Sequence, residues 1–133
     1  AASLRDGREE MEAIAREIAE DFATLERHME RLGIEPRLVK DVAGRAAELV
    51  SRLKPNGRLR GRSPLSDVLE LETLVVGITG KEALWKALGR QAVLEPAEAE
   101  ALVARAAAQR EGVEALRAAA AARAFDPARA DRA

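Results

Sequence analysis

Apolar side chains recur at steps of three and four residues along most of this chain, which is the spacing of one face of an α-helix. In the first such segment, over about residues 7–32, the apolar face consists of Met11, Ile14, Ile18, Phe22, Leu25, Met29 and Leu32. Gly33 follows, and glycine readily adopts the left-handed conformation that ends a helix. The pattern therefore predicts an amphipathic helix that stops near Leu32.

Two further segments, over about residues 36–54 and 96–124, each begin at a proline, which suits the first turn of a helix. The apolar face of the earlier segment consists of Leu38, Val39, Val42, Ala46, Leu49, Val50 and Leu53. The later segment has a thinner face, made of Leu102, Val103, Ala106, Val113, Leu116 and Ala120. Because its side chains are small, we expect the later helix to approach its neighbours closely and to bury little area.

The segment over about residues 64–88 is apolar around most of its circumference. Ser63 stands at the N-cap position and Pro64 at the first helical position. The apolar residues that follow are Leu65, Val68, Leu69, Leu71, Leu74, Val75, Val76 and Ile78. They leave little polar face, so this helix is predicted to be the most buried of the four.

Gly77 and Gly80 raise the question of whether this helix is interrupted. Thr79 with Glu82 has the spacing of a capping box, which favours a break. The apolar steps stay in phase across the glycines, which favours one helix to about Leu88, either straight or kinked near Gly77–Gly80. We prefer the continuous helix and expect Gly89 to end it.

The four segments and their short connections predict an all-α, up-and-down four-helix bundle that occupies residues 1–133 as a single domain. Val, Ile, Thr and aromatic residues are too sparse to supply a sheet. We expect Ala1–Asp6 and residues 126–133 to be disordered.

Composition excludes several classes of function. The chain has 133 residues and a formal net charge of −1, so no global field directs it to nucleic acid or to a membrane. It contains no cysteine, which excludes disulfides, thiolate catalysis and cysteine-based zinc sites. No apolar run is long enough to span a membrane and no signal peptide is visible. We expect a cytoplasmic protein with no membrane partner, no cofactor and no metal.

Residues 52–64 hold five basic residues and no acid. We regard this stretch as a candidate site for a phosphate-bearing ligand, nucleic acid or an acidic protein, because it leads into a helix N-terminus. The candidate residues are Lys54, Arg58, Arg60, Arg62 and Ser63. The alternative is a solvated loop whose arginines pair with acids on neighbouring helix ends.

Glu72 is a candidate buried polar residue, because its neighbours three and four positions away are all valine or leucine. A buried acid needs a partner. One interpretation is a structural ion pair with an arginine. Others are a carboxylate that contacts a ligand near Trp85, or partial exposure at the edge of the apolar face.

The remaining motifs give less information about function. His28 is the one histidine, which excludes a di-iron bundle with paired Glu-x-x-His motifs, and we expect it to be solvated or at the rim. The glycine spacing in residues 77–81 does not fit a nucleotide-binding loop, so we expect these glycines to permit close helix contact around Trp85. No group of serine, acid and histidine suggests a catalytic triad.

These observations favour a non-enzymatic helical interaction or scaffold protein. The alternatives are binding of nucleic acid or a phosphate ligand through residues 54–63, and a small-molecule sensor or enzyme centred on Glu72 and Trp85. The surplus apolar residues Leu65, Leu69, Leu74 and Val76 also predict a homodimer through the helices over 64–88 and 96–124. In the competing arrangement, the first helix or residues 90–95 cover this face within one chain.

Overall fold

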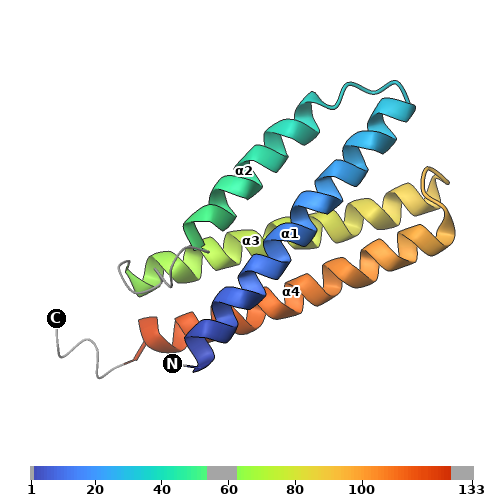
Figure 1. Cartoon of the computed structure of the whole chain (residues 1–133). Helices are drawn as coiled ribbons and strands as arrows, with labels where there is room; N and C mark the ends of the chain where they lie inside the picture. Colours follow the sequence, from blue (N-terminus) through green and yellow to red (C-terminus); the bar gives the residue numbers. More distant parts are fainter. Residues whose placement is uncertain (1, 54–62, 127–133) are drawn as a thin grey trace.

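The computed structural model describes residues 2–53 and 63–126, and side chains for 7–53, 63 and 65–126. Within these ranges the chain forms four helices and no strand: α1 (Ala2–Arg31), α2 (Arg37–Leu53), α3 (Pro64–Arg90) and α4 (Pro96–Ala124). They run alternately up and down as two helical hairpins (Figure 1). The predicted all-α, up-and-down bundle is confirmed.

The helix ends follow local sequence with one clear difference. Gly33 is left-handed, with φ of 73°, and Ile34 N donates to Met29 O at 2.9 Å, which closes α1 as predicted. The expected disorder near the N-terminus is wrong for residues 2–6, since α1 already begins at Ala2. This short stretch contains alanine, leucine and arginine, which favour a helix, and it continues the amphipathic segment without a break. In the expected C-terminal tail, residues 127–133 lie outside the described part of the chain.

The α3 helix is continuous through Gly77 and Gly80. The capping-box side chains have other partners: the Thr79 hydroxyl donates to Val75 O at 2.9 Å, and Glu82 accepts from Arg110 at 2.9 Å. The expectation that Gly89 ends the helix is wrong, because α3 continues to Arg90. A Cβ at position 89 would lie 2.9 Å from the Ala99 Cβ, so glycine is needed there for the close approach of α4.

The core lies where α3 and α4 pack side by side and α1 crosses them (Figure 1). Small side chains on α4 bring its axis near its neighbours, and Ala106, Val113 and Ala120 are fully buried. Trp85, the single tryptophan, is also fully buried. By contrast, α2 contributes only Val50 and Leu53 to the fully buried set. The α2 helix is therefore the least embedded of the four.

Candidate functional site

The predicted basic site falls mostly in a part of the chain that the structure does not describe. Lys54, Arg58, Arg60 and Arg62 lie outside the described residues. Ser63 is exposed at the N-cap of α3, and its carbonyl accepts from Asp67 N at 3.2 Å, but its side chain makes no capping hydrogen bond. Anion binding by this segment stays a prediction.

Glu72 is exposed, so its predicted burial is wrong. The core-facing side of α3 is formed by Leu71, Leu74 and Ile78, and Glu72 lies on the opposite side. Two of its apolar neighbours, Leu69 and Val76, are exposed as well. The apolar residues around Glu72 thus belong to a second, outward-facing stripe, which the helical period alone does not distinguish from the core.

A different set of polar side chains is buried where α1, α3 and α4 meet. The Lys81 Nζ lies 2.6 Å from Asp21 Oδ2, and these side chains are 8% and 2% exposed. Lys81 also donates to Gln109 Oε1 at 2.5 Å. Gln109 in turn donates from Nε2 to Asp21 Oδ2 at 3.2 Å and to Glu17 Oε1 at 3.1 Å. Each of the buried groups is therefore held by at least two partners.

Charge near this network comes mainly from α1 and α4. The Arg105 Nη2 donates to Glu20 at 2.7 Å, and its Nε lies 3.6 Å from Asp21 Oδ1. Burial lowers the pKa of the Lys81 ammonium below its ordinary value of 10.5, although the hydrogen bond and charge of Asp21 oppose that shift. Asp21 and Lys81 form a buried ion pair that joins α1 to α3.

Sequence reasoning missed this network, yet a signal for it exists. Asp21, Lys81 and Gln109 each stand where the helical period calls for an apolar residue. Asp21 lies three residues after Ile18 and four before Leu25. A polar residue at such a position on three separate helices is the pattern expected of a shared buried network.

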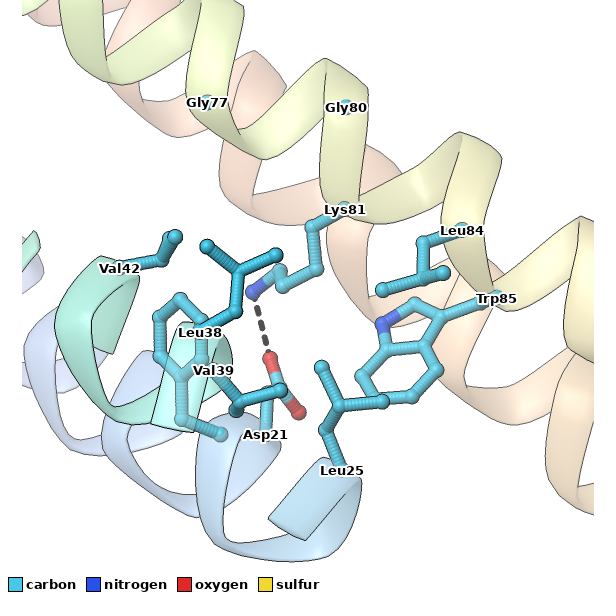
Figure 2. Close-up of a pocket in the computed structure, with 11 residues that line it drawn as sticks. Asp21, Leu25, Leu38, Val39, Val42, Gly77, Gly80, Lys81, Leu84 and Trp85 are labelled. Carbon is cyan, nitrogen blue, oxygen red and sulfur yellow. Dashed lines mark hydrogen bonds and ion pairs between the residues drawn. The ribbon is translucent and has the colours of Figure 1, made fainter. Parts of the chain in front are cut away.

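Beside the ion pair, α1, α2 and α3 enclose a cavity of about 340 Å³ that opens to solvent. Figure 2 shows its lining, which is apolar except at Asp21 and Lys81 and at the indole nitrogen of Trp85. The lining residues are Asp21, Phe22, Leu25, Leu38, Val39, Val42, Gly77, Gly80, Lys81, Leu84 and Trp85. The residues that line it come from three successive helices.

The glycines of α3 form one wall of this cavity. A Cβ added at Gly77 or at Gly80 would meet no atom within 4 Å. The prediction that they permit close helix contact around Trp85 is therefore wrong within this chain. They border open space instead.

A second cavity, of about 460 Å³, lies between α1 and α2. Its walls include Phe22, Ala43, Gly44 and Val50. A Cβ at Gly44 would also meet no atom within 4 Å. The α2 helix thus has unfilled space on two sides, which explains why so few of its side chains are fully buried.

His28 is buried, so the prediction of a solvated or rim residue is wrong. Arg31 Nη2 lies 2.6 Å from His28 Nδ1, and His28 Nε2 lies 3.1 Å from Glu98 Oε1. Because a guanidinium can only donate, Nδ1 is the acceptor and Nε2 carries the hydrogen that points to Glu98. Arg31 also donates to Val93 O at 3.1 Å. This cluster ties the end of α1 to the α3–α4 connection, which is a structural role.

The described helices include none that is both long and apolar enough to cross a membrane. Among the described residues, no group of three or more histidine, aspartate or glutamate side chains is arranged to hold a metal ion. Comparisons of the chain with known protein families, curated proteins and solved structures return no match. Any functional conclusion must therefore come from the geometry of the molecule.

Proposed function

We propose that this protein is a non-enzymatic helical interaction protein that forms a homodimer through the outer face of α3. The observation that carries the proposal is an exposed stripe of apolar and small side chains on that helix. The outer stripe consists of Leu65, Leu69, Val76, Gly80, Ala83 and Ala87, all of which are exposed. It runs for about 33 Å at roughly 1.5 Å per residue.

The outer stripe lies opposite the core-facing residues of α3. Its members are spaced by three, four or seven residues, which places them on one side of the helix. Leu65, Leu69 and Val76 are 48%, 56% and 66% exposed. A helix at the surface of a globular protein normally buries one apolar stripe and keeps the other side polar. Two opposite apolar stripes on one helix support contact with something outside the chain.

A second copy of α3 fits this stripe in an antiparallel pair. The small residues Gly80, Ala83 and Ala87 allow two helix axes to approach closely, and space above Gly80 is open. If the helices cross near Gly80, Glu72 of one copy comes within one turn of Arg90 of the other. Both residues lie on the same flank of the stripe, and a two-fold axis brings like flanks together. Opposite charges then meet at each end of the contact.

The other part of the predicted dimer surface is not supported. In the described part of α4, no large apolar side chain is exposed. Leu74 is buried in the core rather than available to a partner. Neither α1 nor residues 90–95 cover Leu69 and Val76, so these side chains remain accessible. We therefore confine the proposed contact to α3.

The test is the mass of the protein in solution. Wild type should sediment at about twice its chain mass of 14.3 kDa at micromolar concentration. Val76→Glu should return it to the monomer mass, because each copy would then bury a carboxylate without a partner in the apolar contact. Ala119→Glu on the exposed side of α4 is the matched control and should leave the dimer intact. A wild-type mass of one chain at every concentration would exclude the dimer.

A further inference from the structure

The cavity between α1, α2 and α3 is lined by hydrogen-bond donors that have no acceptor within the described part of the chain. The Lys81 ammonium has three hydrogens, and two of them are directed to Asp21 Oδ2 and Gln109 Oε1. One hydrogen remains on a side chain that lines the cavity. A donor buried at the inner wall of an apolar cavity costs free energy unless it has an acceptor.

Trp85 supplies a second donor at the same wall. Its side chain is fully buried, and its Nε1 has no hydrogen-bond partner among the described residues. Buried donors are nearly always paired, so an unpaired indole N–H is an exception that needs a reason. Figure 2 shows the indole nitrogen on the edge of the ring that faces the cavity and the side of Lys81. Lys81 and Trp85 therefore both bring to this wall a donor hydrogen without an acceptor among the described residues.

Glycine keeps the space beside these donors open. Glycine is an unfavourable residue inside a helix, and α3 carries it at both Gly77 and Gly80. Neither position needs glycine for contact within the chain, since a Cβ would meet nothing within 4 Å. Larger side chains here would fill the cavity in front of Lys81 and Trp85.

The surrounding charges decide what kind of acceptor fits. Lys81 is already paired with Asp21, and Arg105 faces the three acids Glu17, Glu20 and Asp21. These two basic and three acidic groups together have a net charge of −1. A carboxylate or phosphate would place a second negative charge beside Asp21, whereas a neutral carbonyl oxygen would accept a hydrogen bond without adding charge.

We infer that this cavity is a binding site for a small, neutral, mostly apolar molecule that carries a carbonyl oxygen. The oxygen lies at Lys81 Nζ and Trp85 Nε1, and the apolar part lies among Leu25, Val39 and Leu84. The volume of about 340 Å³ is near the lower end of known ligand pockets, which run from roughly 300 to 1,000 Å³. The lining shares only Gly80 with the outer stripe, so separate variants test the site and the proposed dimer.

Trp85 provides a direct measurement, since it is the only tryptophan in the chain. Titration with methyl hexyl ketone should change the indole emission and saturate. Octanoate, which has a chain of similar length and a charged head, should bind at least tenfold more weakly. Butylbenzene, which is apolar and has no acceptor, should bind more weakly than the ketone.

Variants separate a specific site from general apolar binding. Gly77→Leu should abolish saturable binding of the ketone while the helical circular dichroism stays that of wild type. Gly44→Leu makes the same change in the neighbouring cavity and should leave binding intact. If Gly77→Leu fails to fold, Gly77→Ala fills part of the same space and should weaken binding.

Trp85→Phe keeps an aromatic ring and removes the donor, and binding to it is followed by ligand-observed NMR. It should weaken ketone binding about threefold to tenfold, as expected for one hydrogen bond, and leave butylbenzene unchanged. Absence of saturable ketone binding, equal binding of octanoate, or full binding by the Gly77→Leu variant would each overturn the inference. Val76→Glu, which tests the dimer, should bind the ketone as wild type does.

Discussion

Helical glycines lie in opposite surroundings in two regions of the molecule. One region is the closely packed α3–α4 pair, called the tight half here, and the other is the side of the molecule that α2 occupies, called the loose flank. In the tight half, Gly89 sits where a Cβ would collide with Ala99 at 2.9 Å. On the loose flank, Gly44, Gly77 and Gly80 border space in which a Cβ would meet nothing. Glycine in a helix therefore marks close packing in one region and an open cavity in the other. The difference indicates that the loose flank is where this molecule has room to bind.

The largest effect should come from the ion pair at the boundary between the two regions. Asp21→Asn or Lys81→Met alone should lower the free energy of unfolding by about 3–5 kcal/mol, because each breaks the buried ion pair and leaves the other charge buried without it. The double variant Asp21→Asn with Lys81→Met should restore most of that loss. Denaturant unfolding of the four proteins measures the cycle. If the stability lost in the double variant equals the sum of the losses in the two single variants, the two side chains do not act as a pair.

The next largest difference is expected when one leucine in each region is replaced by alanine. Leu71→Ala, in the buried face of α3, should cost about 2–5 kcal/mol through lost burial and a cavity. Leu38→Ala on α2, where the side chain is 73% exposed, should change stability by no more than about 0.5 kcal/mol. The same denaturant titrations give both values. A large loss at Leu38 would mean that the α2 flank is closed in solution.

A pair of glycine variants tests the difference in space directly. Gly77→Ala should stabilise the protein by about 1 kcal/mol, because alanine is the better helix former and its Cβ meets nothing. Gly89→Ala gains the same propensity but forces α3 away from α4, so it should be about 1–3 kcal/mol less stable than Gly77→Ala. Thermal unfolding of both proteins decides this. If the variants are equally stable, the packing difference is not real.

The smallest effect is a dependence on pH. The pKa of Lys81 is lowered from 10.5 in the folded protein, so folded Lys81 releases its proton at a lower pH than unfolded Lys81 does. Between these two values the unfolded state binds more protons, so the contribution of Lys81 to stability rises with pH. The slope is at most about 1.4 kcal/mol per pH unit.

The comparison protein for this measurement is the Asp21→Asn, Lys81→Met double variant, which lacks the pair and keeps every other titrating group. The unfolding free energy of wild type relative to this variant should increase from neutral pH towards pH 10.5. A constant or falling difference would contradict the lowered pKa.

Sequence alone determined the helices of this protein. The apolar period and the prolines at positions 36, 64 and 96 placed four helices, because these signals act over one or two turns. The start of α1 is the exception, since the helix begins five residues before the predicted Gly7. The continuity of α3 was also predictable, since its apolar steps stay in phase across Gly77 and Gly80.

Tertiary structure decided which face of each helix is buried. On α3, two opposite stripes are apolar, and the helical period does not say which one meets the core, so the sequence does not decide whether Glu72 is buried or exposed. His28 is buried because Arg31 and Glu98, from two different helices, surround it. The pairing of Asp21 with Lys81, and the cavity beside it, join residues 60 positions apart. Such contacts depend on how whole helices pack, which no local pattern contains.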